Sequence, residues 1–162
     1  MLKMWLLVMG LATLVCLASG ADISPTDSPD LPMTNEKNSS TQVKPMKILI
    51  TVDGNPIRAT LADNATARDF AALLPLTVIL EDYSRTEKIY YLPKKLSTAG
   101  APAGITPVIG DITYYAPWGN LAIFYKDFGY SSGLIKLGGI ESGGELLNVS
   151  GSVKATIQLI HD

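Results

Sequence analysis

One short pattern in the chain resembles a catalytic serine motif. The run GYSSG at residues 129–133 fits G-x-S-x-G, in which a serine sits on a sharp turn between a strand and a helix, and His161 follows it along the chain. Such an arrangement would support acyl transfer. The residues after Gly133 read as a strand rather than a helix, however, and the chain is too short for a hydrolase sheet. We therefore expect Ser131 and Ser132 to be loop residues, and we predict no catalytic residue here.

Metal and phosphate chemistry lack the residue types that they need. His161 and Cys16 are the only histidine and cysteine, whereas zinc usually takes several such ligands. The acids Glu81 and Asp82 have no spaced calcium-ligand loop around them and are interpreted as a solvated strand end. The stretch GGIESGGE at residues 138–145 lacks the Lys-Ser or Lys-Thr of a phosphate loop, so its glycines are expected in tight turns around a short helix. We predict no metal and no cofactor.

The strongest signal is aromatic. Five aromatic residues lie between Tyr114 and Tyr125, around a Pro-Trp-Gly-Asn turn at residues 117–120. Pro117 fixes φ, and the Gly-Asn pair after Trp118 can adopt positive φ, so the turn should be stiff and the indole should project from it. Side chains alternate along both strands, so one face of this hairpin must be core. Because cross-strand aromatic pairs stabilise sheets, a purely structural cluster is the default interpretation.

The alternative interpretation is a recognition site. An indole at the tip of a turn is costly to leave exposed without a partner, and other aromatic residues lie close to it in the sequence. They would line an apolar groove with polar rims that binds an extended peptide or a small apolar ligand. The candidate ligand-binding residues are Tyr115, Trp118, Phe128 and Tyr130.

The elements that must position these residues are mostly short strands. KILITV and PIRATL flank a turn at residues 53–56, and further strand-like runs follow as LTVILEDY, EKIYYL, DITYYA, LAIFYKD, GLIKLGGI and SVKATIQLI. The segment DNATARDFAALLP predicts a helix with Asn64 or Thr66 as N-cap that stops before Pro75, with Phe70, Leu73 and Leu74 facing inward. GGELL predicts a second, short helical turn. Residues 93–107 are rich in Pro, Gly and Ala and should form a long, ordered, irregular loop.

This order of elements predicts a mainly β fold, a closed or nearly closed antiparallel β-barrel with one or two short α-helices. Closure would also remove exposed sheet edges. Hydrophobic residues make up 47% of the 162 positions, which is enough for one core. The formal net charge is −2 and no basic stripe occurs, so nucleic acid is not an expected partner.

The N-terminal region differs in composition from the rest. Residues 1–20 place Lys3 before an uncharged apolar run that ends in small residues, the pattern of a secretory signal peptide, with cleavage near Gly20 and Ala21. Residues 21–45 are rich in Pro, Ser, Thr, Asp and Asn and are expected to be a disordered tether. Residues 46–162 would then form the folded domain. We expect an exported protein, periplasmic or extracellular.

Two alternatives concern the apolar N-terminal run. A retained membrane anchor is one, but the run is shorter than the ~20 residues that span a bilayer and no charged stop-transfer segment follows. Lipid attachment at Cys16 is the other, but Thr13-Leu14-Val15 lacks the small residue that normally precedes a modified cysteine. We expect contact with a membrane only if the segment stays uncleaved or is lipidated.

The segment GDITYYAPWGNLAIFYKD, followed by GLIKLGGIESG and preceded by LPKKLSTAGAPAG, resembles the bacterial cyclophilin-like family, a set of largely uncharacterised β-barrel proteins. The most specific parts are GDI at residues 110–112, YAPWG at residues 115–119 and the DNATARDFAALLP helix. The resemblance covers nearly the whole predicted domain. It implies a cyclophilin-type barrel capped by helices, in agreement with the order of strands.

The resemblance does not carry prolyl isomerase activity with it. In true cyclophilins catalysis rests on an arginine in an FHR-type strand, a glutamine and aromatic residues of the groove, and those motifs are not found here. Arg58, Arg68 and Arg85 are expected on a strand, on the helix and in a turn. An unrelated arrangement could still place a donor over a proline amide nitrogen. The first hypothesis is therefore an exported binding module. The alternatives are a divergent peptidyl-prolyl cis-trans isomerase of the cell envelope and a purely structural barrel.

Overall fold

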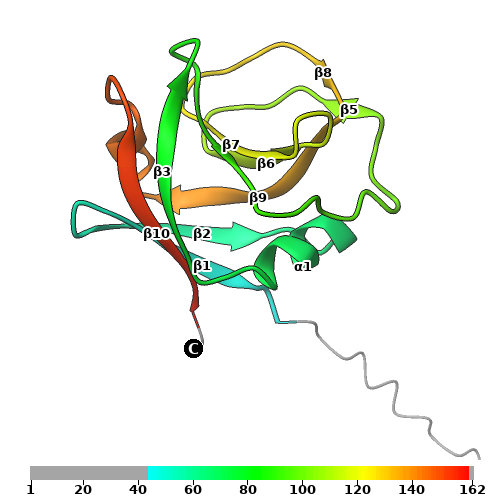
Figure 1. Cartoon of the computed structure of the whole chain (residues 1–162), viewed down its shortest axis with the longest axis horizontal. Coiled ribbons are helices and arrows are strands. Elements are labelled where there is room, and N and C mark those ends of the chain that lie inside the picture. The colour runs from blue at the N-terminus through cyan, green and yellow to red at the C-terminus, as the bar shows by residue number, and fades with distance from the viewer. Residues whose placement is uncertain (1–43, 161–162) are drawn as a thin grey trace, which may run out of the picture. The chain divides into compact units, whose positions relative to one another are not determined.

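A computed structural model describes residues 44–160, and its main feature is a closed antiparallel barrel (Figure 1). Around the barrel the strands follow the order β1 (Lys47–Val52), β10 (Val153–Ile160), β3 (Leu76–Tyr83), β4 (Glu87–Tyr91), β7 (Asn120–Phe124), β6 (Asp111–Tyr115), β9 (Leu134–Ser142) and β2 (Asn55–Leu61), and β2 pairs with β1 again. The predicted mainly β, closed antiparallel barrel is confirmed. The predicted signal peptide, Cys16, most of the predicted tether and His161 lie outside the described residues.

The barrel interior is filled by aliphatic side chains from alternate strand positions. In β1 the buried residues are Ile48, Ile50 and Val52, and the residues between them are half-buried, because successive side chains of a strand point to opposite faces. A two-residue turn with positive φ, Asp53 and Gly54, joins β1 to β2. The alternation of buried side chains in β1 and the turn residues that follow it therefore specify the same pairing register of β1 with β2.

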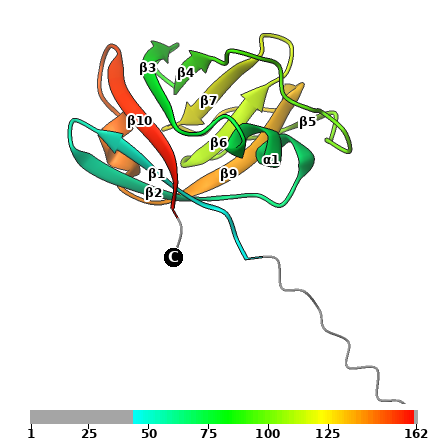
Figure 2. The same cartoon turned by 60° about the horizontal axis from the view of Figure 1, so that its bottom comes forward.

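The predicted helix is shorter than expected. α1 (Ala65–Ala71) begins after Asn64, whose side chain accepts a hydrogen bond of 2.8 Å from the Ala67 backbone N–H, so Asn64 is the N-cap. Phe70 is fully buried in the core, as predicted. Leu73 and Leu74 lie beyond the helix and pack against the core while only partly buried. Figure 2 shows α1 beside β9, which it contacts.

The glycine-rich stretch lies mainly inside a strand, which corrects the prediction of turns. Gly138 and Gly139 belong to β9, whereas Gly143 is the N-cap of the 3-10 helix η1 (Gly144–Leu147) and Gly144 is its first residue. A Cβ on Gly138 would lie 2.4 Å from the Thr60 carbonyl oxygen of β2. Glycine is therefore needed there for close packing of two neighbouring strands.

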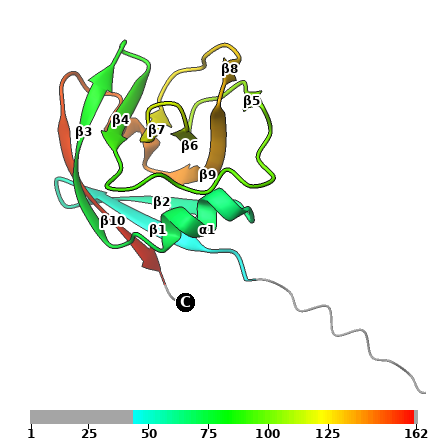
Figure 3. The ribbon, with the colours of Figure 1, turned by 45° about the vertical axis from the view of Figure 1, so that its right-hand side comes forward.

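A second small sheet covers part of the outer face of the barrel. β5 (Gly104–Ile105) pairs with β8 (Ser131–Ser132), and β5 contacts β9 (Figure 3). We call these two strands and the loops of residues 93–110 and 126–133 the cover. The long loop at residues 93–107 is irregular as predicted, apart from β5. Within residues 44–160 no helix has both the length and the apolar character needed to span a bilayer.

An aromatic pocket on the outer face of the barrel

The hairpin formed by β6 and β7 supplies both core and pocket, because β7 is buried on both of its faces. Leu121 and Ile123 pack into the barrel interior. Ala122 and Phe124 belong to a second apolar cluster, which includes Leu134 of β9 and is packed by Ile105 of the cover. The sequence left open whether this hairpin is core or recognition surface. In the structure one face of β7 packs into the barrel interior and the other belongs to the outer cluster, so the two interpretations are compatible.

Beside this outer cluster lies a pocket of about 220 Å³. Its apolar walls are formed by Tyr83, Tyr115, Trp118, Phe124, Phe128 and Leu134, and its polar lining residues are Glu87, Asn120 and Ser131. The pocket therefore has apolar walls and few polar groups, as is usual for small-molecule sites.

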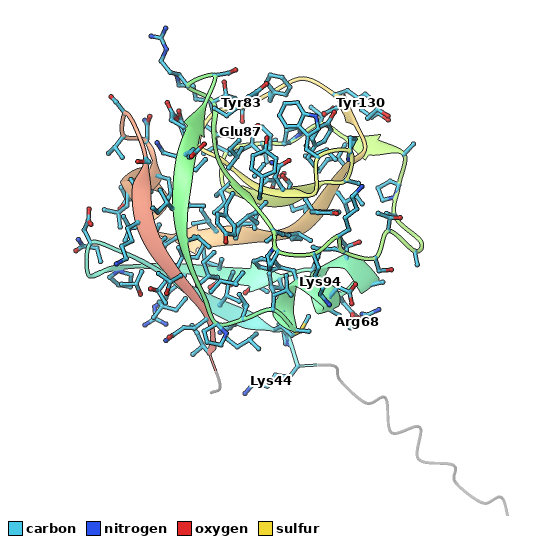
Figure 4. All side chains as sticks on the ribbon, in the orientation of Figure 1. Lys44, Arg68, Tyr83, Glu87, Lys94 and Tyr130 are labelled. Atoms are coloured by element: carbon cyan, nitrogen blue, oxygen red, sulfur yellow. The ribbon has the colours of Figure 1, made fainter. Side chains whose placement is uncertain are left out.

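Strand register brings most of the lining together. Glu87 of β4 lies opposite Tyr83 on one side and Phe124 on the other. Tyr115 of β6 lies opposite Asn120 on one side and Leu134 on the other. Figure 4 shows Tyr83 and Glu87 next to each other. The pocket floor is thus a rigid, hydrogen-bonded part of the barrel.

The Trp118 indole forms one wall of the pocket. Its ring is edge-on to Tyr115, with centroids 5.4 Å apart and planes at 78°, and edge-on to Tyr83, at 5.7 Å and 84°. Gly119 has φ 76° and its N–H donates to the Tyr115 carbonyl oxygen at 2.8 Å, which fixes the turn that carries the indole. Trp118 remains 48% exposed. Gly119 adopts the positive φ that the sequence predicted, and the indole is reachable from solvent.

Glu87 places an acid among these rings. Within residues 44–160 its carboxylate has no hydrogen bond or ion pair, and burial raises its pKa to about 7. A carboxyl group with such a pKa changes charge near neutral pH. Half-buried, unpaired acids of this kind occur more often at functional sites than elsewhere.

Asn120 lines the same pocket, and its amide oxygen is buried. The residue is 2% exposed, and its Nδ2 donates to the Leu121 carbonyl oxygen at 3.2 Å. That bond fixes the orientation of the amide, and Oδ1 is left without a partner. A buried acceptor without a donor is a cost to the stability of the fold. Asn120 is the first residue of β7 and not a positive-φ turn residue, in contrast to the conformation expected from sequence.

The serine motif does not form a nucleophile elbow. Ser131 and Ser132 make up β8 and no helix follows them. Ser131 also lines the pocket, which the interpretation as a loop residue did not anticipate. β8 approaches β5 closely because Gly104 has no side chain: a Cβ there would lie 2.3 Å from the Ser131 carbonyl oxygen and 2.8 Å from the Tyr130 hydroxyl.

Three of the four residues chosen from the sequence line the pocket together, namely Tyr115, Trp118 and Phe128. Tyr130, labelled in Figure 4, is 62% exposed on the cover and is not among the lining residues. Sequence reasoning missed Tyr83, Glu87 and Asn120. The alternation of EKIYYL places Glu87 on the same face as Ile89 and Tyr91, but it does not reveal which strand lies alongside.

None of the three arginines lines the pocket. Arg58 lies on β2, and Arg68 of α1 is paired with Asp63. Arg85 lies in the turn between β3 and β4 and lines a different cavity together with Asp82 and Tyr125.

Asp82 is part of a buried polar cluster, which corrects its interpretation as a solvated strand end. It accepts hydrogen bonds from the Tyr125 hydroxyl and from Lys88 Nζ, at 3.3 Å for the latter. The Tyr125 bond first, and then Lys88, hold the pKa of Asp82 below its usual value. Among the described residues no group of three or more His, Cys, Asp or Glu is placed to hold a metal ion.

Comparison with known proteins identifies the family. A model of the cyclophilin-like family matches residues 50–158, and the chain belongs to that family. Among solved structures, the solution structure of a hypothetical protein from Archaeoglobus fulgidus is similar, with a TM-score of 0.51 and 16% sequence identity over 70% of this chain and 94% of the other. At that identity the likeness concerns the fold alone. A search of curated proteins found no match.

Proposed function

We propose that the chain is an exported binding domain whose outer-face pocket holds one apolar or aromatic group of a small organic molecule or of a peptide. The observation that carries this proposal is the pocket itself, in which aromatic walls surround a half-buried carboxyl group, Glu87, that has no partner within residues 44–160. A ligand with a hydrogen-bond donor would pair with that group and cover the walls at the same time.

The size and the setting of the pocket support binding of a compact group. About 220 Å³ is at the small end for ligand sites, so it suits one side chain or a molecule of similar size. Exposed aromatic residues outside the pocket, Tyr91 and Tyr130, would allow a longer ligand to extend over the surface. The proposal of export rests on the composition of residues 1–20 and 21–45.

The alternative function, a divergent peptidyl-prolyl isomerase of the cell envelope, has less support. It needs a donor above the proline amide nitrogen, and the pocket is lined by no arginine, while Asn120 Nδ2 already donates to Leu121. A protease-coupled assay with a proline peptide separates the two functions. Acceleration over buffer at micromolar protein would favour the isomerase, and no acceleration would favour binding alone.

The binding proposal is tested with Trp118 as reporter. Trp5 and Trp118 are the only tryptophans, so Trp5→Phe in the full chain makes the pocket the sole source of indole fluorescence. We expect p-cresol, a neutral aromatic probe with one donor, to change that fluorescence in a saturable way. Phe128→Ala should weaken the response, because Phe128 lines the pocket and is 51% exposed.

Ile79→Ala is the matched control. Ile79 is an equally exposed apolar residue, at 59%, and does not line the pocket, so its removal should leave the response unchanged. Equal responses of the two variants, or no saturable response to p-cresol, would contradict a binding role for this pocket.

A further inference from the structure

The Trp118 indole stands nearly perpendicular to two other rings of the pocket. It meets Tyr115 at 78° and Tyr83 at 84°, with centroids 5.4 Å and 5.7 Å away. Where two rings meet edge-on, a ligand group that touches the edge of one ring faces the π surface of the other. The face of an aromatic ring carries negative potential and attracts a cation within about 6 Å, and an indole does so most strongly.

The charge of the pocket lining is negative, like the potential at the ring faces. Glu87 is the only ionisable lining residue besides the tyrosines, and no lysine or arginine lines the pocket. Glu87 has no partner within residues 44–160. When Glu87 is ionised, the lining residues carry one negative charge and no positive charge. What the pocket lacks is a positively charged group.

Other ligand classes satisfy only part of this arrangement. A neutral ligand can contact the rings but leaves the charge of the half-buried Glu87 carboxylate uncompensated, which is unfavourable. An anion would be repelled by the carboxylate and by the ring faces. An organic cation can contact the ring faces and pair with Glu87.

We propose that the pocket selects organic cations, meaning an ammonium group carried by a small molecule or by a peptide side chain, with Tyr83, Tyr115 and Trp118 as the ring faces and Glu87 as the counter-charge. This inference rests on the proposed binding function and specifies its ligand class. It assigns Glu87 the role of a specificity-determining residue.

Such binding depends on pH. Glu87 has to be ionised to pair with a cation, and its pKa is about 7 in the empty pocket, so affinity rises as pH rises through neutrality. The other ionisable groups that face the pocket are the phenols of Tyr83 and Tyr115. Tyr125, which follows β7, has its pKa raised to about 12 by burial and by Asp82, with a smaller effect from Glu87. Arg85, in the turn before Glu87, lines a different cavity.

The experiment compares two probes of the same shape. Choline carries a quaternary ammonium, and 3,3-dimethyl-1-butanol is its neutral isostere. Each is titrated into the full chain carrying Trp5→Phe, at about pH 8.5, where Glu87 is ionised, with Trp118 fluorescence as readout. We expect choline to bind roughly tenfold more tightly than the isostere. At about pH 5.5 that preference should shrink, because Glu87 is then protonated.

Two isosteric variants identify the origin of the preference. Glu87→Gln should abolish most of it while p-cresol still binds. Glu81→Gln makes the same change of charge at an exposed acid of β3 that does not line the pocket, and it should keep the preference. Equal affinity of the two probes for the unmodified pocket, or a preference that survives Glu87→Gln, overturns the cation inference. The binding proposal has its own readout, the response to p-cresol and its loss in Phe128→Ala, so the two proposals can fail separately.

Discussion

The ring of Tyr83 stands edge-on to the indole of Trp118, with centroids 5.7 Å apart, although the two residues lie on separate hairpins. Tyr83 ends β3, and Trp118 lies in the turn between β6 and β7. They meet because β4 pairs with β3 on one side and with β7 on the other. The site therefore exists only in the closed barrel, and its residues divide into those that hold the fold and those that contact a ligand.

Trp118→Ala should remove ligand binding and leave the fold intact. Loss of its ring contacts should cost about 1 kcal/mol of unfolding free energy, because the indole is half exposed. Leu121→Ala, three residues along at a fully buried interior position, should cost about 3 kcal/mol. Chemical denaturation of both variants measures the difference. A Trp118→Ala protein as unstable as Leu121→Ala would make the indole structural.

Glu87 should make the protein less stable as pH rises from about 4.5 to 7. Its pKa is raised to about 7 from 4.5, so in this range the folded protein retains a proton that the unfolded chain releases, and the free energy of unfolding falls with pH. Since the group is only half-buried, solvent screening reduces the effect to the order of 1 kcal/mol. Denaturation across this range should show the fall.

Glu87→Gln is the control for that pH dependence. The variant should lose this part of the slope and should be more stable than the unmodified protein at about pH 8. Asp82 acts in a different range: its lowered pKa stabilises the fold above its ordinary value of 3.8 and the gain is lost at lower pH. An unchanged slope between pH 4.5 and 7 in Glu87→Gln would mean that another group is responsible.

Gly104→Ala should separate β5 from β8. The new methyl group would lie 2.3 Å from a backbone oxygen, which cannot move away as a flexible side chain can. We expect a loss of about 1–3 kcal/mol in stability and a weaker response of Trp118 to p-cresol, because Ser131 leaves the pocket. Gly129→Ala, with nothing within 4 Å and no positive φ, should change neither quantity. Normal binding by Gly104→Ala would show that the cover does not shape the site.

Lys88→Met should destabilise the barrel without affecting the pocket. Lys88 is fully buried, and its Nζ donates to the carbonyl oxygens of Val149 and Gly151 at 2.6 Å each, besides Asp82. Removal of the charge breaks these bonds and should cost about 3 kcal/mol. Lys126→Met, at an exposed lysine near the Tyr125 ring, should cost less than about 0.5 kcal/mol. Thermal unfolding compares the two, and equal costs would contradict the structural role of Lys88.

Local signals in the sequence were sufficient for the fold. Alternation of apolar residues and turn residues such as Asp53-Gly54 predict strands and hairpins, and Asn64 correctly marks the start of the helix. Leu73 and Leu74 were assigned to that helix because their spacing fits it, but α1 ends at Ala71 and Ala72 is its C-cap. Helix ends depend on local capping and on packing, which residue spacing alone does not specify.

Three of the nine residues that line the pocket were found in the same way, and the other six were not. Tyr115, Trp118 and Phe128 lie close together in the sequence, so they could be grouped without knowledge of the fold. Glu87 joins them only through the pairing of β4 with β7, which no local pattern encodes. Gly138 was assigned to a turn for a related reason, since its close approach to Thr60 depends on a strand distant in the sequence.

Closure of the barrel also limits how occupancy of the pocket could be signalled to another molecule. Each barrel strand is held by ladders on both sides, so sliding one strand would break two sets of backbone bonds at once. The β5–β8 ladder joins only two residues to two and is the shortest strand pairing of the fold. We therefore expect a change of shape upon occupancy in the cover rather than in the barrel, and a protein that distinguishes the loaded from the empty state would contact the cover.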